Sequence, residues 1–401
     1  MTGHVQDRVR DRADGRNGEI AKTGKIEMSG SLAMARSAPD ATASPAERPR
    51  GPSGRRVLTA ADYLGADGGL RLATAEASHY ADAAPSTLFT EPAYLRAYEA
   101  GALLLVEAQP GRDAPRLVFT RAKGGLIHQG RLARVDETLV SSLADRLMAK
   151  AGAGFVVFED VEFTGPLPRG PRRFVFHYQN NWRLPLPERE AQVPPKVVAN
   201  TKRCLRNLAR DNPGVALRFE AAPQRSVLDA ITAFGRIRIE GQGRRYGIDD
   251  SETVRLAAVA SEVGHSSILT MGDTILAADL ICRSGDQAYF LTHGYHPGYP
   301  TSSLGKITLI NSIEASRAAG IVDFNLMWGD LPYKAQVGAI CIPLQTVVTR
   351  RSRLGLIGPG HLATVLHFAR LDLKRRLRPA IHRLRTRIAE RRGSAVRGSG
   401  R

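Results

Sequence analysis

The sequence predicts a mixed α/β fold, of the α+β kind with a mixed sheet, across most of its 401 residues. Apolar runs of strand length, such as GFVVFEDVEF and TILAADLICRSG, alternate with amphipathic stretches of helix length. The connections between these segments are short, which is typical of such a fold. Hydrophobic residues make up 43% of the chain, enough for a large core, and the length fits two domains or one large one.

The net charge of +18 is concentrated at the two ends of the chain. Residues 1–56 carry about +4 and residues 350–401 about +13, which leaves the middle near neutral. A basic groove for nucleic acid across the folded body is therefore disfavoured. Residues 1–56 have few large apolar groups and bury too little surface to offset their ordering entropy, so we expect a disordered tail there.

A first folded domain is predicted over residues 57–185. The stretches STLFTEPAYLRAYEAG and DETLVSSLADRLMAKAG have helical periodicity, whereas ALLLVEA, RLVFTRA and GFVVFEDVEF are typical of strands. The stretch RRFVFHYQNNWRLPLP extends the sheet and leaves it through prolines.

A second domain is predicted over residues 186–348. It begins with a helix, KVVANTKRCLRNLARD, and a strand, VALRFEA, followed by the helices RSVLDAITAFGRIRIEG and SETVRLAAVASEVG. Three strands come next, then a helix from about residue 305 to 319, and finally the strands IVDFNLMW and AICIPLQTVVTR.

A turn and a helix within THGYHPGYPTSSLGKITLINSIEASRAAG indicate an anion site. Ser302 or Ser303 is expected to cap the helix, and Gly320 to end it. Free backbone N–H groups and the positive end of the helix dipole favour an anion at its start. Gly305 permits close approach of a ligand, and Lys306 adds a cation. An ordinary capped surface helix is the competing interpretation.

The order strand, strand, anion-competent turn, helix, strand is that of the acyl-CoA-binding half of the GNAT acetyltransferase fold. The stretches TKRCLRNLARD, ILTMGDTILAADL and YFLTHGYHPGYPTSSLGKITLINSIEASRAAGIVDFNLMWGDLPYKAQVG carry the resemblance, which covers roughly residues 85–348. The chain resembles the cellulose-biosynthesis-type (CelD-like) branch of the GNAT superfamily, which is related to FemAB-type aminoacyl transferases. The resemblance implies two GNAT domains in tandem, with the acyltransferase site in the second.

The resemblance also implies a cosubstrate, acetyl-CoA or another acyl-CoA, and no metal. Its pantetheine arm would enter between the strands QAYFLTHGY and IVDFNLMW, which separate in the GNAT fold. The residues expected to hold its pyrophosphate are Tyr299, Ser302, Ser303, Leu304, Gly305 and Lys306. Pro300 removes one backbone donor from this turn.

No Ser/His/Asp or Cys/His arrangement is evident, and the resemblance implies direct attack on the thioester. Asp323 is a candidate base or acceptor-positioning group. Tyr333 would protonate the leaving thiolate, and Lys334 would hold the oxyanion or an anionic acceptor. His293 is a candidate base at the mouth of the gap. The structural alternatives are ion pairs, hydrogen bonds or a surface helix, and Asp279 is expected to be paired, edge-facing or exposed in the cleft.

The acceptor class follows from the resemblance alone, as an envelope- or exopolysaccharide-related sugar, a lipid or an amino compound. One alternative is a FemAB-like transferase that uses aminoacyl-tRNA, which the basic helix TKRCLRNLARD would serve. Another is a non-catalytic GNAT-fold scaffold within a polysaccharide synthesis complex.

The C-terminal segment, residues 349–401, is predicted to be a basic amphipathic helix. Apolar residues recur every three or four positions, at Leu362, Leu366, Ala369, Leu373, Leu377, Ile381, Leu384 and Ile388. An anionic membrane surface, the folded body and nucleic acid are the three partners that this pattern leaves open.

The cysteines and the hydropathy pattern indicate a cytoplasmic location, with the basic tail as a candidate contact to the inner membrane. The three cysteines share no metal-binding spacing and fit reduced, buried thiols. No apolar run reaches the length of a membrane span, and the N-terminus has no hydrophobic segment of the kind secretion needs.

Overall fold

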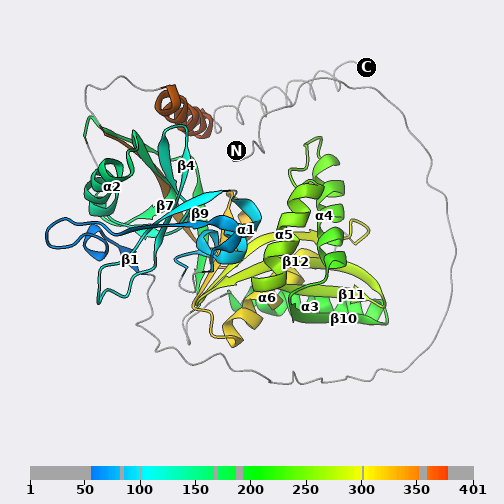
Figure 1. Ribbon diagram of the computed structural model, residues 1–401. Coiled ribbons are helices and arrows are strands. Elements are labelled where there is room, and N and C mark those ends of the chain that lie inside the picture. Colours follow the sequence, from blue (N-terminus) through cyan, green and yellow to red (C-terminus); the bar gives the residue numbers. More distant parts are fainter. Residues whose placement is uncertain are drawn as a thin grey trace, which may run out of the picture. The chain divides into compact units, whose positions relative to one another are not determined.

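The structure is a computed structural model that describes residues 56–81, 85–99, 101–166, 170–186, 193–299, 302–351 and 359–377 (Figure 1). Strands and helices alternate through this part of the chain, and the predicted mixed α/β fold is confirmed. The disordered tail predicted over residues 1–56 lies outside the described residues, apart from Arg56.

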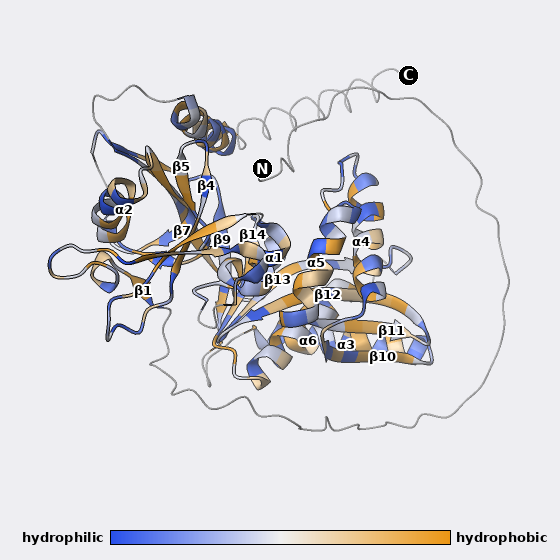
Figure 2. Cartoon of the chain, in the orientation of Figure 1, coloured by the Kyte–Doolittle hydropathy of each residue, from blue (hydrophilic) through white to orange (hydrophobic). Residues whose placement is uncertain are grey.

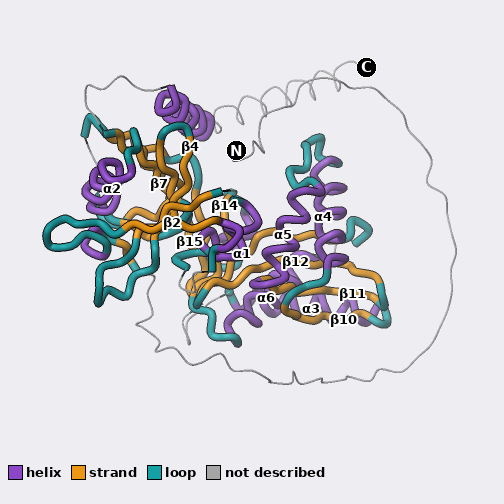
Figure 3. The backbone as a smooth tube through the Cα atoms, viewed as in Figure 1, coloured by secondary structure: helices purple, strands orange, loops and turns teal. Residues whose placement is uncertain are grey.

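The first half of the chain contains nine strands and several short helices among its described residues. Figure 3 distinguishes the helices, strands and loops by colour. The strands are β1 (Val57–Leu58), β2 (Leu72–Glu76), β3 (Ala102–Val106), β4 (Leu117–Ala122), β5 (Gly125–His128), β6 (Arg134–Val135), β7 (Phe155–Phe163), β8 (Arg173–Phe176) and β9 (Asn180–Pro185). The helices are α1 (Pro92–Tyr98) and α2 (Ala144–Ala151), with 3-10 turns at Ala60–Asp62, Ala77–His79 and Leu88–Thr90 and a π-helical turn at Leu139–Leu143.

The second half has longer elements. Its helices are α3 (Pro195–Asp211), α4 (Arg225–Glu240), α5 (Asp250–Val263), α6 (Leu304–Ala318) and α7 (Pro332–Gln336). Its strands are β10 (Val215–Ala221), β11 (Gly264–Met271), β12 (Thr274–Ser284), β13 (Gln287–Tyr295), β14 (Asp323–Trp328) and β15 (Ile340–Arg350). A final helix covers residues 359–377.

The same sheet topology occurs twice. In the first half, β2, β3, β4 and β5 form an antiparallel meander, and β7 then joins β5 in parallel after the helix α2. In the second half, β10, β11, β12 and β13 form the meander, and β14 joins β13 in parallel after the helix α6. This duplication is the tandem arrangement that the sequence predicts.

Each half completes its sheet with a strand from the other half. The strand β9, from the first half, pairs antiparallel with β14, while β15, at the end of the second half, pairs antiparallel with β7 and β8. The two exchanged strands also pair with each other. Arg183 of β9 reinforces the exchange, because its guanidinium lies 3.5 Å from both Glu162 of β7 and Asp323 of β14.

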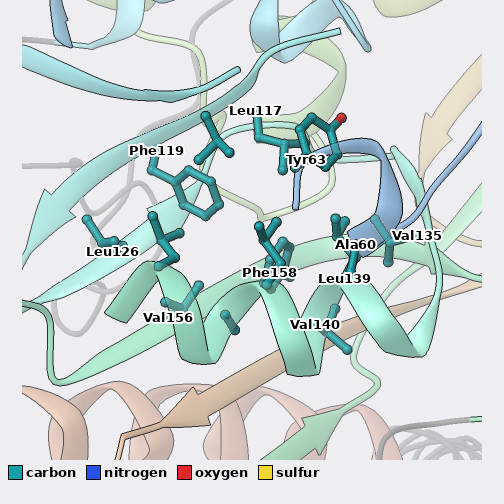
Figure 4. Packing of buried hydrophobic residues seen from close by; sticks show 14 of the residues in the cluster. Ala60, Tyr63, Leu117, Phe119, Leu126, Val135, Leu139, Val140, Val156 and Phe158 are labelled. Carbon is teal, nitrogen blue, oxygen red and sulfur yellow. The ribbon is translucent and has the colours of Figure 1, made fainter. Parts of the chain in front are cut away.

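The first core lies between the sheet of the first half and its helical turns (Figure 4). Phe119, Leu126 and Phe158 from the strands meet Leu139 and Val140 from the π-helical turn, and all five are fully buried. Strands β5 and β7 are mostly hydrophobic along their length (Figure 2). Such runs are expected of strands that are covered on both faces.

In the second half, helices cover the two faces of the sheet. α6 packs through Leu304 and Ile307 on β11 and β12, with α3 beside it. α4 and α5 pack through Ile231 and Ala260 on β12 and β13. Gly294 of β13 marks the α4 face, because an ideal Cβ there would come within 2.5 Å of the Ile231 carbonyl oxygen.

Local sequence accounts for the ends of these helices. Proline occupies the first turn of α1, α3 and α7, where its missing N–H is not needed. The side chain of Asp249 caps α5 by accepting from the Glu252 N–H at 2.8 Å. α6 ends as predicted, with Gly320 at φ +78° and the Ile321 N–H donating back to the Ser316 carbonyl.

The helices and the long strands lie where the sequence predicts them. Four strands, β1, β2, β5 and β6, were not predicted. β5 has only four residues and begins with Gly125, whose ideal Cβ would come within 2.4 Å of the Phe155 ring. Such a short, glycine-initiated segment gives no period by which it could be recognised.

Candidate active site where β13 and β14 separate

Strands β13 and β14 pair over only three residues each, and Tyr289 and Asn325 form the last pair. The register of β13 against β12 shifts just beyond this point and leaves Leu291 as an extra residue. The register of β14 against β9 shifts likewise, at Leu326, and Met327 takes a left-handed φ of +59°. A bulge bends and twists a strand, so the two bulges turn β13 and β14 away from each other.

The helix α6 begins beside this opening. Its N-cap residue, Ser303, has a left-handed φ of +54° and makes no side-chain cap, so the prediction that Ser302 or Ser303 caps the helix is wrong. The Ser303 carbonyl accepts from the N–H groups of Lys306 and Ile307. The N–H groups of Leu304 and Gly305 precede the first bond of the helix and point out of its end.

The other residues predicted to hold the pyrophosphate surround this helix end. Leu304 is buried, with its side chain in the core under α6. Gly305 lies against the aromatic wall of β13, since an ideal Cβ there would be 3.1 Å from the Tyr295 ring and 3.5 Å from the His293 ring. Lys306 donates from Nζ to Gln336 Oε1 at 3.2 Å, which ties α6 to α7.

Tyr299 closes the other side of the turn. Its hydroxyl lies 3.9 Å from Met271 Sδ, and its ring meets His296 edge-on at a centroid distance of 5.6 Å. Pro300 lies outside the described residues.

His293 lies at the centre of a group of side chains from three elements. Its Nε2 atom is 3.3 Å from the guanidinium of Arg238, which belongs to α4, and its ring meets that of Tyr333, from α7, at 6.3 Å. Burial, together with the cations Arg238 and Lys334, lowers the pKa of His293 to about 4. The imidazole is therefore neutral at pH 7, and its Nε2 accepts a hydrogen bond from Arg238.

Arg238 reaches this group from the opposite side of the sheet. Gly294 faces α4, and side chains alternate along a strand, so His293 and Tyr295 face α6. The Arg238 guanidinium extends past β13 and lies 5.2 Å from the centre of the Tyr295 ring. The half-buried guanidinium therefore contacts two aromatic rings, those of His293 and Tyr295.

Lys334 is almost completely buried, with 2% of its surface exposed. Its Nζ atom donates to the carbonyl oxygens of Met327 at 3.1 Å and Trp328 at 2.6 Å, at the end of β14. Burial lowers the pKa of Lys334 to about 8, while nearby Asp330 acts in the opposite direction. Asp330 itself accepts from Trp182 Nε1 at 3.0 Å.

Tyr333 is the neighbour of Lys334 on α7. Burial raises its pKa to about 12, and the positive charge of Arg238 partly opposes that rise. The phenol therefore keeps its proton at neutral pH.

Asp323 lies at the opposite end of β14. It is paired in register with Gln287, before the strands separate, and its Oδ1 is 3.5 Å from the Arg183 guanidinium. Five residues of strand place it roughly 17 Å from Trp328. The structure therefore does not bring Asp323 together with the other three predicted catalytic residues.

Asp279 is fully buried beneath α6, so the predicted exposure in the cleft is wrong, and its carboxylate is held by hydrogen bonds. Its carboxylate accepts from the Ser267 N–H and from the Ser312 hydroxyl, each at 2.9 Å. Burial raises the pKa of Asp279 to about 7.

The structure thus collects His293, Tyr333, Lys334 and Gly305 at the opening and adds Arg238, which sequence reasoning missed. A signal was present, because Ile231, Gly235 and Arg238 share the helical spacing of one face of α4. The periodicity alone places Arg238 on the face toward the sheet.

The described residues contain no cluster of three or more His, Cys, Asp or Glu side chains that could hold a metal ion. In the same part of the chain, no helix has the length and hydrophobicity needed to cross a membrane.

The comparison with protein families decides what this arrangement resembles. The family model described as "Acetyltransferase (GNAT) domain" matches residues 195–335. This segment is similar to a GNAT acetyltransferase domain. The GNAT-like domain, as we call residues 195–335, contains the diverging strands, the start of α6 and all four predicted catalytic residues.

Solved structures of similar topology include transferases of several kinds. The C-terminal domain of a putative lysylphosphatidylglycerol synthetase from Agrobacterium fabrum is 15% identical, and the match covers 63% of this chain and 85% of that one (TM-score 0.41). FemX is 11% identical, with 61% and 87% covered (TM-score 0.43). A tandem GNAT protein from the clavulanic acid biosynthesis pathway is 11% identical, with 71% and 99% covered (TM-score 0.35).

The comparison with curated proteins gives no match.

Proposed function

We propose that the protein is an acyl-CoA-dependent acyltransferase that transfers an acyl group to an amine or hydroxyl by direct attack on the thioester. The observation that carries this proposal is the divergence of β13 and β14 beyond Tyr289 and Asn325, beside the uncapped start of α6. Beyond that pair, the edge of β13 toward β14 offers backbone groups that β14 does not satisfy. A pantetheine arm carries amides that pair with such an edge.

The anionic part of the donor would lie at the start of α6. The N–H groups of Leu304 and Gly305 and the positive end of the helix dipole favour a pyrophosphate there. The absence of a Gly305 side chain leaves room beside Tyr295. The Tyr299 and Ser302 side chains complete the predicted binding turn.

The positive groups at the opening fit the charge that develops during acyl transfer. When the acceptor attacks, the carbonyl oxygen of the thioester becomes negative, and in this proposal the Arg238 guanidinium and the Lys334 ammonium stabilise that charge. A new C–N or C–O bond forms and the C–S bond breaks. Tyr333, which keeps its proton at neutral pH, donates it to the leaving sulfur, and the acceptor's proton replaces it by way of solvent.

In this proposal His293 does not act as a general base. An imidazole with a pKa of about 4 is a weak base at neutral pH, and its Nε2 is engaged by Arg238. We assign it to the orientation of Arg238. Asp323, at the paired end of β14, stays a predicted base or acceptor-positioning group.

We infer the acceptor from the resemblance to CelD-like enzymes. It would be an envelope- or exopolysaccharide-related sugar or an amino compound. A cytoplasmic location, peripheral to the inner membrane, is part of the same prediction.

Calorimetric titration of the full-length protein with acetyl-CoA and with longer acyl-CoAs tests the proposal. We expect micromolar binding that Gly305→Val weakens, followed by release of free CoA thiol when an acceptor is added. The proposal is overturned if no acyl-CoA binds. It is also overturned if transfer requires aminoacyl-tRNA and is indifferent to acyl-CoA. Tight binding of acyl-CoA with no transfer to any amine or sugar would favour the scaffold instead.

A further inference from the structure

The helix at residues 359–377 exposes a row of leucines that the fold does not use. Leu362, Leu366, Leu373 and Leu377 are 45%, 59%, 56% and 46% exposed. At 100° per residue these four side chains fall within an arc of about 60° on the helix surface. The row is roughly 22 Å long, at 1.5 Å per residue. We call these four residues the leucine row.

A different face of the same helix holds it against the first half of the chain. Phe368 is buried with Phe155, Phe176 and Val348, and its ring stacks on that of Tyr178 at 5.9 Å. His361 and Asp372 are buried on the same side. The helix is therefore docked without the leucine row, which means that the exposed leucines are not needed for its packing.

Basic side chains flank the leucine row on both sides. Arg370 and Lys374 follow it around the helix in one direction, and Arg376 lies in the other, held by Asp372 at 2.9 Å. The sequence beyond the described residues continues the pattern, with apolar residues at Ile381, Leu384 and Ile388 between arginines. An exposed apolar row between cations is the pattern of a helix that lies in the headgroup region of a bilayer.

We propose that the leucine row and its basic flanks bind the surface of an anionic phospholipid membrane. The helix lies parallel to the surface, with the leucines among the upper acyl chains and the cations at the phosphates. This places the protein at a membrane irrespective of the reaction that it catalyses.

The charge pattern disfavours the two other candidate partners of the leucine row, which are nucleic acid and a second copy of the helix. Nucleic acid would neutralise the cations but leave four leucines exposed to water. A second copy of the helix would bring basic flanks of equal sign together on both sides of a single row of leucines, and such pairs repel. A membrane with anionic headgroups satisfies the leucines and the cations at once.

Cosedimentation of the full-length protein with lipid vesicles tests the proposal. Vesicles of phosphatidylcholine alone are compared with vesicles that also contain phosphatidylglycerol, for the wild type and for the double variant Leu366→Ser/Leu373→Ser. The matched control is Ile237→Ser/Val254→Ser, because these residues are similarly exposed, at 54% and 55%, but belong to α4 and α5. Circular dichroism checks that each variant is folded.

We expect the wild type and the control to bind the anionic vesicles, and the leucine variant to bind them about tenfold more weakly. Binding should fall for vesicles without phosphatidylglycerol and as salt is raised. The proposal is overturned if the wild type stays in the supernatant, or if the leucine variant binds as well as the control. If the protein does not bind vesicles but binds DNA or RNA, nucleic acid is the partner and the proposal is overturned. If it does not bind vesicles but forms a dimer that the leucine substitutions disrupt, the partner is a second copy of the chain.

Discussion

The Nζ atom of Lys334 donates a hydrogen bond to the carbonyl oxygen of Trp328 at 2.6 Å, and this bond attaches α7 to the end of β14. A second bond, to the Met327 carbonyl, engages the strand at its bulge. Lys334 therefore sets where the neighbouring Tyr333 lies relative to His293 of β13. The same buried ammonium supplies part of the positive charge at the opening.

Lys334→Met should lower the free energy of unfolding by about 1–3 kcal/mol, because two buried carbonyls lose their donor. Chemical denaturation measures the change, and Lys196→Met, at an exposed position of α3, is the control. Equal stability of the two variants would contradict the structural role of Lys334. A loss of kcat beyond the loss of folded protein would support its role at the oxyanion.

Arg238→Gln should raise the pKa of His293 from about 4, because the largest neighbouring positive charge is removed while burial remains. Titration of the His293 ring protons by NMR measures this shift. Arg236→Gln, at an exposed position on the same helix, should leave the titration unchanged. If Arg238→Gln also leaves it unchanged, the two side chains are not in contact in solution. The proposed mechanism also predicts a lower kcat for Arg238→Gln, because a cation that stabilises the oxyanion is lost.

Gly305→Ala should weaken acyl-CoA binding about tenfold, which corresponds to ~1.4 kcal/mol. The added Cβ lies 3.1 Å from the Tyr295 ring, in the place assigned to the pyrophosphate. Alanine is a better helix former than glycine, so the helix itself should not be weakened. Titration with acetyl-CoA compares this variant with Glu314→Ala, at an exposed position farther along α6. If both variants bind acetyl-CoA with equal affinity, the start of α6 is not part of the binding site.

Asp323→Asn separates the catalytic prediction from a structural one. As a partner of Arg183, which also meets Glu162, Asp323 should contribute about 1.5–3 kcal/mol to stability through its charged contact. We expect the variant to unfold more easily, and an unchanged kcat of the folded enzyme would contradict a catalytic role for Asp323. Full stability with a large loss of kcat would instead support Asp323 as the base or acceptor-positioning residue.

Asp279→Asn should change the pH dependence of stability. The pKa of Asp279 is raised from 3.8 to about 7 by burial, so between these values the folded state binds more protons than the unfolded state. Its contribution is therefore complete below pH 4 and is lost as the pH rises through 7. At ~1.4 kcal/mol per pKa unit, the loss is on the order of 4 kcal/mol.

Denaturation of the wild type and of Asp279→Asn at pH 5 and pH 8 measures this difference. The amide can accept from the Ser267 N–H and donate to the Ser312 hydroxyl, so the variant should lose less stability than the wild type between the two pH values. Parallel pH curves would show that Asp279 does not titrate in this range.

Local periodicity was sufficient for the long elements of the second half. The apolar run at Thr274–Ser284 is covered by helices on both faces of the sheet, and α6 shows a helical repeat between Leu304 and Ile313, so each element carries its own signal. Gly320 was identified as the end of α6 because a left-handed residue is needed there. The candidate residues His293, Tyr333 and Lys334 were found by resemblance, since nothing in their spacing requires them to meet.

What the sequence by itself determined was the long helices and strands, the tandem mixed sheets and the basic amphipathic pattern at the end of the chain. Only the tertiary structure decided the exchange of β9 and β15 between the halves, because strand pairing depends on contacts between residues far apart in the chain. It also decided that Asp279 is buried under Ser312, that Asp323 lies away from the opening, and that Arg238 lies within it. These outcomes depend on which faces of the helices and sheets pack together, and the local hydrophobic periodicity of the sequence does not contain that information.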